Sequence, residues 1–253
     1  MNKLRPYVFS AALLALAAAG LSRLLGPALA PGPAAIAAAF WDLGKSGELF
    51  REMAVTVWRA LAGILAANLA GAALGLLAGS RSGALRLTAP LVAGLQSCPP
   101  VVWISLVMVW AGTGGLVPVA TVFAAAFPLV FSTTAQGVMA LDRRVLAMSR
   151  LYAVPRLRVF RRFILPGIMP YWLAGFSTVL AAGWKAAAVA EFLGSHRGIG
   201  ARIYWSYSKL NMEDLYAWAL ALIILGTLLE GALITPLRRR AARMQSRGRV
   251  ENA

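Results

Sequence analysis

Long apolar stretches recur along this chain, and short polar or basic segments separate them. A helix needs about 20 mostly apolar residues to cross the hydrocarbon layer of a membrane. The pattern predicts about six such helices, at Tyr7–Ala30, Val55–Ala78, Leu87–Trp110, Val117–Ala140, Gly167–Leu193 and Leu215–Leu237. The expected fold is therefore an all-α membrane protein of about six transmembrane helices.

The first stretch has two interpretations. Lys3 and Arg5 precede it, as in a signal peptide that is cleaved. Its apolar length exceeds the 7–15 residues of a signal-peptide core, which favours an uncleaved span. The following segment, Pro31–Arg51, mixes proline, glycine and charged residues. We expect a loop there, with short amphipathic helical pieces outside the membrane.

Prolines and glycines predict special packing in two of the spans. Pro99 and Pro100 lie inside the third stretch, and proline in a helix interior removes a hydrogen bond and kinks or breaks the helix. Gly71 and Gly75 lie four residues apart in the second stretch, where small residues let two helices approach closely. We also expect Glu230, in the sixth stretch, to pack against a neighbouring helix.

Composition agrees with a membrane location. The 253 residues are 60% hydrophobic and 13% charged, whereas a soluble domain is about 45–50% apolar and about 25% charged. The net charge of +16 alone would suit a nucleic-acid-binding protein. The basic residues, however, collect between the apolar stretches, as the positive-inside rule requires. No nucleic-acid partner is expected, and a single cysteine and a single histidine leave no set of ligands for a metal site built from those residues.

The positions of the charges predict the topology. One set of connecting segments is strongly basic, and it contains Lys3, Arg5, Arg81, Arg86, Arg143, Arg144, Arg150, Arg156, Arg158, Arg161, Arg162, Arg238, Arg239, Arg240, Arg243, Arg247 and Arg249. In the other set, basic residues are offset by Asp42, Glu48, Glu52, Glu213 and Asp214. Both termini are therefore predicted to face the cytoplasm.

The segment 141–170 reads LDRRVLAMSRLYAVPRLRVFRRFILPGIMP. Its apolar residues alternate with arginines at roughly helical spacing. This pattern predicts two short amphipathic helices separated near Ala153-Val154-Pro155, since proline disfavours helix at the residue before it and often begins the next helix. Such a helix pair either lies on anionic lipid or docks on a partner.

This segment resembles the cytoplasmic coupling loop of ABC-importer permeases. The family pattern is Glu-Ala-Ala, three residues, Gly, nine residues, then Ile-x-Leu-Pro. Phe163-Ile164-Leu165-Pro166 matches its end, and the spacing then places Ala153 at the glycine and Ala147-Met148-Ser149 at Glu-Ala-Ala. The chain therefore departs from the pattern at its acidic residue and at its glycine.

Two further segments resemble the nitrate/sulfonate/taurine branch of that family. Residues 95–104, LQSCPPVVWI, are similar to the proline-kinked third helix of the branch. Residues 181–194 and Gly198-Ile199-Gly200 are similar to its fifth helix and the loop that follows. The resemblance spans residues 50–240. It divides the chain into a first helix with a periplasmic segment (1–50), a permease core (51–240) and a basic cytoplasmic tail (241–253).

The resemblance implies a transport subunit of a bacterial inner-membrane importer. Two copies would form the pore, with cytoplasmic ATPase subunits on one side and a periplasmic solute-binding protein on the other. ATP and magnesium would bind to the ATPase, because this chain has no phosphate-binding loop and is not expected to be an enzyme. The residues implied in ATPase coupling are Ala147, Met148, Ser149, Arg150, Tyr152, Ala153, Pro155, Leu165 and Pro166.

The candidate translocation-path residues come from the proline break and the fifth span. They are Pro99, Pro100, Trp103, Trp184, Lys185 and Glu191. Ionisable residues inside a membrane span are functional candidates by default, and Lys185 would favour an anion. Lys185 and Glu191 are six residues apart, so they need not pair. The expected substrate is a small anion such as a sulfonate, taurine or nitrate. The alternatives are a permease for a pyrimidine-type or other uncharged or cationic solute, and a self-contained secondary transporter.

Overall fold

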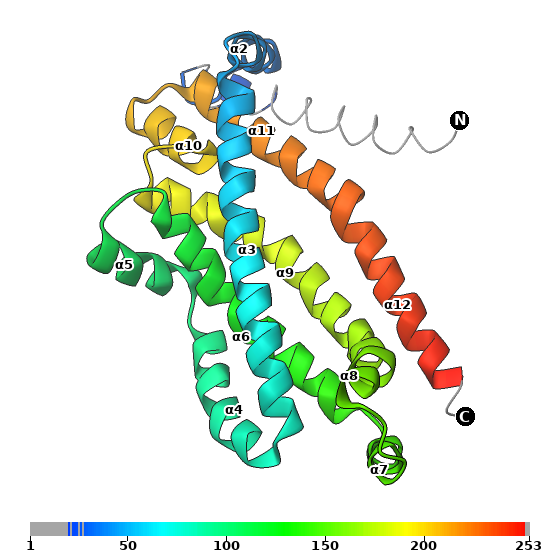
Figure 1. The fold of residues 1–253 in the computed structure, drawn as a ribbon. Coiled ribbons are helices and arrows are strands. Elements are labelled where there is room, and N and C mark those ends of the chain that lie inside the picture. Colours follow the sequence, from blue (N-terminus) through cyan, green and yellow to red (C-terminus); the bar gives the residue numbers. More distant parts are fainter. Residues whose placement is uncertain (1–19, 21, 25, 27, 251–253) are drawn as a thin grey trace, which may run out of the picture.

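The computed structural model describes residues 20–250 except 21, 25 and 27, and the described part is helical, with no strand. The predicted first span, Tyr7–Ala30, lies mostly outside it. Figure 1 shows a bundle of long helices with short helices at both ends. The elements are α2 (Pro33–Lys45), α3 (Glu48–Ser80), α4 (Ser82–Ser97), α5 (Pro100–Ala111), α6 (Leu116–Met139), α7 (Arg143–Leu151), α8 (Arg156–Val159), η1 (Phe160–Ile164), α9 (Leu165–Gly194), α10 (Ile199–Ser208), α11 (Met212–Leu229), η2 (Glu230–Ile234) and α12 (Thr235–Val250).

Four helices of the described part are long and apolar enough to cross a membrane. They run over Glu48–Ser80, Leu116–Met139, Arg156–Gly194 and Met212–Ala241. They correspond to the predicted second, fourth, fifth and sixth spans. A fifth crossing would be added if the bent pair α4 and α5 counts as one span. The described residues thus support a multi-pass all-α protein and account for four or five of the six expected spans.

The third predicted span is broken rather than merely kinked. The helices on either side of the break, Gly83–Ser97 and Pro100–Ala111, differ in direction by 93°. Cys98 and Pro99 between them have extended backbone angles, and Pro100 takes the first position of α5. Two successive prolines remove two amide donors and disfavour helix at the preceding residues, which explains the sharp break.

Two segments between the predicted spans contain helices, which was expected for the first segment but not for the second. The segment Pro31–Arg51 contains one helix, α2, and α3 already begins at Glu48 instead of Val55. The polar loop expected over Gly194–Glu213 contains α10. That helix buries one face, with Ile199, Gly200, Ala201 and Ser206, so its exposed polar face concealed it in the sequence.

The centre of the bundle is the contact of α3 with α6, to which α9 adds a third face. The core there consists of Ala60, Ile64 and Ala67 of α3, Val122, Ala126 and Val130 of α6, and Val179, Leu180 and Ala187 of α9. Gly71 and Gly75 lie against α6. A Cβ at Gly75 would lie 2.6 Å from the carbonyl oxygen of Phe131, and one at Gly71 would lie 2.9 Å from the Cβ of Val130. The close helix approach predicted from these glycines is confirmed.

Substitution of Gly75 tests this contact. Gly75→Val should lower the stability of the detergent-solubilised protein by about 1–3 kcal/mol, because the side chain would force α3 and α6 apart. Gly94→Ala in α4 is the matched control, since a Cβ there meets no atom within 4 Å. The measurement is the thermal unfolding midpoint by tryptophan fluorescence. Equal midpoints for wild type and Gly75→Val would contradict the packing described here.

Candidate functional site

At one end of the bundle the chain forms an elbow, which we define as α7, the turn 152–155 and α8. Figure 1 shows α7 standing apart from the long helices at this end. Asp142 caps α7, since its carboxylate accepts a hydrogen bond from the Arg144 amide at 2.7 Å. The two predicted amphipathic helices are confirmed. The second is not separate, however, because α8 continues through the π-helical turn η1 into α9.

The turn of the elbow places an alanine in a conformation that favours glycine. Ala153 has φ 49°, in the left-handed region. The Val154 amide donates to the Ser149 carbonyl at 2.9 Å, and the Tyr152 amide donates to the Met148 carbonyl at 3.0 Å, which closes the end of α7. A residue with a Cβ in this region costs about 1–2 kcal/mol relative to glycine. The position that matches the glycine of the coupling-loop pattern is therefore the one where the backbone conformation favours glycine.

The elbow presents apolar side chains to its surroundings. Leu151, Tyr152 and Leu157 are exposed, and neither α7 nor α8 contains a buried residue. A groove of about 740 Å³ lies inside the bend, lined by Leu146, Ser149, Arg150, Ala153, Val154, Pro155, Arg156, Val159, Phe160 and Ile164. Exposed apolar patches of this kind mark surfaces that contact a partner or a membrane.

The predicted coupling residues separate into two groups. Ser149, Arg150, Ala153 and Pro155 line the groove together. Ala147, Met148 and Tyr152 are exposed beside it. Leu165 and Pro166 lie beyond η1, in the first turn of the membrane-length helix α9. The structure therefore does not bring this last pair into the groove.

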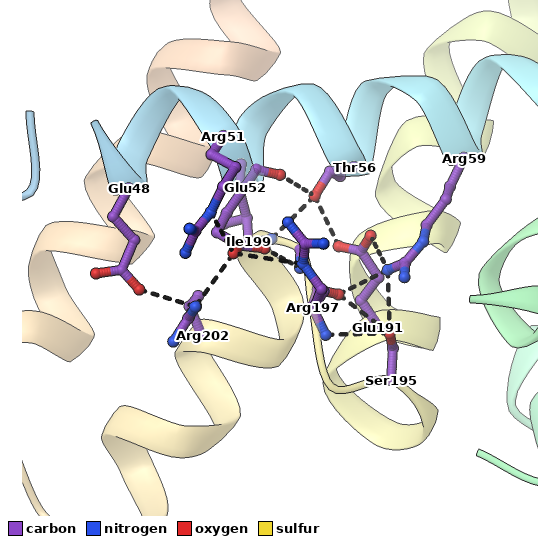
Figure 2. Close-up of polar contacts among 11 residues, drawn as sticks. Glu48, Arg51, Glu52, Thr56, Arg59, Glu191, Ser195, Arg197, Ile199 and Arg202 are labelled. Carbon is purple, nitrogen blue, oxygen red and sulfur yellow. Dashed lines mark hydrogen bonds and ion pairs between the residues drawn. The ribbon is translucent and has the colours of Figure 1, made fainter. Parts of the chain in front are cut away.

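The opposite end of the bundle, called the far end below, contains a buried polar cluster. Figure 2 shows Thr56 and Arg59 of α3 directed toward Glu191 of α9. Glu191 is fully buried, and it accepts hydrogen bonds from the Thr56 hydroxyl at 2.7 Å and from the Arg59 guanidinium at 3.0 Å. The same Arg59 nitrogen also donates to the Ser195 hydroxyl at 3.0 Å and to the Arg197 carbonyl at 2.6 Å. Arg59 thus joins α3 to the end of α9 and to the loop that follows.

A second buried carboxylate completes the cluster. Glu52 accepts from the Gly198 amide at 2.7 Å and from the Arg202 guanidinium at 3.1 Å. Arg202 also pairs with Glu48 at 2.9 Å. The Ile199 amide donates to the Thr56 hydroxyl at 2.9 Å. The first amides of α10 have no partner within their own helix, and side chains of α3 bond them instead. The carboxylates of Glu52 and Glu191 lie near this positive end of α10.

The cluster explains two glycines of the Gly198-Ile199-Gly200 segment. Gly198 has φ 101°, and a Cβ on it would collide with the Glu191 carboxylate. A Cβ on Gly200 would collide with the carbonyl oxygen of Ala188. Both positions are restricted to glycine by the close approach of α10 to α9. For this reason the corner between α9 and α10 has little freedom to change its geometry.

The candidate path residues are spread over three places. Lys185 is exposed on α9, with its ammonium 5.7 Å from the centre of the Trp184 ring. Both residues line a groove of about 330 Å³, which is bounded by apolar residues of α9, α10 and α11. Pro99, Pro100 and Trp103 lie at the break and in α5, outside this groove. Glu191 belongs to the buried cluster. Lys185 and Glu191 do not pair, as their spacing predicted.

Two ionisable residues of the spans have partners that the sequence pattern does not reveal. Arg59 is the single basic residue in the predicted second span, and that isolation was the signal that could have marked it as the partner of an acid. The bond of Glu230 lies within its own helix. The Glu230 side chain is half-exposed and bonds Arg238 at 3.2 Å, across η2. No group of histidine, cysteine, aspartate and glutamate suited to a metal ion occurs among the described residues.

Comparison with known proteins shows the family to which the chain belongs. The family of binding-protein-dependent transport system inner membrane components matches residues 71–239, more than half of the chain. The chain belongs to this family. Among its relatives, the putative aliphatic sulfonates transport permease protein SsuC of Escherichia coli is 31% identical over 176 residues, 70% of this chain and 67% of the relative. The nitrate import permease protein NrtB of Leptolyngbya laminosa is 27% identical over 206 residues, 78% and 72% of the two chains.

The fold has a counterpart among solved structures. A chain of the MetNI methionine ABC transporter, in a structure of its inward-facing conformations, superposes with a TM-score of 0.64 at 16% identity, over 78% of this chain and 95% of that one. This permease therefore has an ABC-importer permease fold and belongs to the nitrate/sulfonate/taurine branch. It is a multi-pass inner-membrane subunit of a transport system that depends on a binding protein.

The left-handed conformation of Ala153 can be tested by substitution. Ala153→Gly should stabilise the turn by about 1 kcal/mol, because glycine adopts a positive φ without strain. The measurement is amide hydrogen exchange, and the Val154 amide should exchange more slowly. The control is Ala147→Gly, an exposed site inside α7, where glycine should cost about 1 kcal/mol. Faster exchange in both variants would contradict the conformation assigned to Ala153.

Proposed function

We propose that two copies of this permease form the translocation path of an ABC importer for a small anion. Each elbow docks on a cytoplasmic ATPase subunit, which binds the ATP and magnesium. A periplasmic solute-binding protein delivers the substrate at the far end, and both termini face the cytoplasm. The observation that carries the proposal is the apolar, unburied elbow on a helix that continues across the membrane.

The shape of the elbow supports docking on a protein. Leu151 is 81% exposed and Tyr152 is 72% exposed, at the tip of a turn whose backbone amides are internally bonded. Such a tip presents anchor side chains at little entropic cost, as tight interfaces require. A helix pair that only lay on lipid would have no need of a groove with an ordered turn at its edge.

The distribution of charge supports the orientation. Basic residues gather with almost no acidic partner at the elbow end, in the α3–α4 turn, in α7 and α8, and at the start of α12. At the far end the basic residues, among them Arg51, Arg197 and Arg202, are offset by Asp42, Glu48, Glu52 and Glu213. Arginine and lysine concentrate on the cytoplasmic side of inner-membrane proteins. The elbow end is therefore the cytoplasmic one in this proposal.

An anionic substrate is supported by Lys185 and by the relatives. Thr178, Ala182, Lys185, Val189 and Leu193 are the exposed residues along one stripe of α9, and Lys185 is its only charge. A cation on a membrane-length helix is costly unless it faces a polar path or a partner. The names of the relatives refer to sulfonates and nitrate. The stripe of α9 is the surface that we assign to the path.

A pull-down tests the importer assignment. The tagged permease, extracted gently from its own host, should recover an ATPase subunit. Leu151→Asp should reduce that recovery at least about tenfold, equivalent to about 1.4 kcal/mol, because the anchor is lost from the interface. Leu210→Asp is the matched control, an exposed leucine at the far end. Failure of the wild type to recover any ATPase would contradict the proposal and favour a self-contained transporter.

Uptake tests the substrate class. Proteoliposomes that contain the complete importer should accumulate ethanesulfonate, taurine or nitrate when ATP is supplied. Lys185→Gln should reduce this uptake about tenfold or more, whereas Lys185→Arg retains the charge and most of the activity. Accumulation of cytosine that these anions do not inhibit would contradict the assignment and support the pyrimidine-type alternative.

A further inference from the structure

The helix that begins at the elbow ends in the buried cluster. From Arg156 to Gly194 it runs for 39 residues as one continuous helix that includes the π-helical turn η1. At about 1.5 Å per residue it is about 58 Å long, enough to reach from one side of a membrane to the other. A displacement imposed on the elbow is therefore delivered to the far end by one continuous element.

At the far end, α9 is attached to its surroundings through a few buried bonds. Glu191, in its last turn, bonds Thr56 and Arg59 of α3. Arg59 is only 12% exposed, and one of its nitrogens bridges Glu191, Ser195 and the Arg197 carbonyl. A buried carboxylate separated from its cation is strongly disfavoured. The end of α9 and this part of α3 therefore remain joined when either one moves.

The same corner also holds the outer end of the broken helix. The Gly114 amide, in the turn between α5 and α6, donates to the Gly194 carbonyl at 2.8 Å. Thr113 in that turn contacts His196 at 3.2 Å. A Cβ on Gly115 would lie 3.2 Å from the Arg59 guanidinium. The start of α10 is bonded to Glu52 and Thr56. Arg59 thus lies where α3, the α5–α6 turn and the α9–α10 corner meet.

We infer that Arg59 is a positioning residue of the transport cycle, which makes the α9–α10 corner, the α5–α6 turn and α3 move as one unit when the elbow moves. This inference rests on the proposed function. Arg59 touches neither the groove beside Lys185 nor the elbow. Its loss should leave the response of the elbow to ATP intact and remove the response of the far end.

The test uses one spin label in each copy of the permease, within the complete complex in lipid nanodiscs. Native Cys98 is replaced by alanine, and a label at Val145→Cys, an exposed residue of α7 outside the groove, or at Leu210→Cys reports the distance between copies at the elbow or at the far end. Distances are measured by pulsed electron resonance, without nucleotide and after trapping with Mg-ATP and vanadate. In the wild type both distances should change on trapping.

In Arg59→Met the elbow distance should change as in the wild type, and the change at the far end should fall to less than half. Arg202→Met is the matched control. It removes an arginine of the same cluster that pairs with Glu48 and Glu52 of α3 but not with α9, and it should retain both changes. A merely structural role of Arg59 would weaken the response at both ends equally.

Arg59→Gln provides a second variant if Arg59→Met does not assemble. It keeps a polar side chain in the cluster but removes the cation that pairs with Glu191, and it should reduce the change at the far end while the elbow responds fully. Full responses of the far end in both variants, or in Arg59→Gln alone if only that one assembles, would overturn the inference. A wild-type complex whose elbow distance does not change would overturn the proposed function and the inference together.

Discussion

A carboxylate removed from water must be matched by a cation or by several hydrogen-bond donors, and the far end of this permease is organised around two of them. Glu52 and Glu191 are both fully buried. Their donors come from α3, from the loop after α9 and from α10, so these elements must meet for either charge to be tolerated. Placement of α10, the shape of the α9–α10 corner and the glycines at 198 and 200 all follow from this requirement.

Much of the architecture could be predicted from hydropathy, because lipid imposes one simple rule on every span. The stretches Val117–Ala140 and Leu215–Leu237 correspond to α6 and to the helix from Met212 to Ala241. The proline pair identified the break. The apolar pattern could not reveal α10 or the early start of α3, because both contain charged and polar residues whose partners lie in another helix.

The elbow could be located from the sequence, whereas the buried cluster could not. The elbow is local, so spacing and the Ala153-Val154-Pro155 turn were sufficient to locate it. The buried cluster is not local, since Glu52 and Glu191 are joined to partners more than 130 residues away in most of their contacts. A single sequence shows which groups are unusual, such as Arg59 in an apolar stretch. It does not show which distant group neutralises them.

Two of the membrane-length helices contain a π-helical turn, which inserts one extra residue into the helix. The turn Phe160–Ile164 lies between the elbow and α9. The turn Glu230–Ile234 lies between α11 and α12. A turn of this kind accommodates one residue more than an α-helix would. Because the wider turn absorbs this residue locally, the two halves keep nearly the facing directions that an unbroken α-helix would give them, and deletion of the extra residue would restore a regular helix without turning one half against the other. Faces counted along the sequence at intervals of three and four residues therefore shift by one residue where the helix passes through each π-turn.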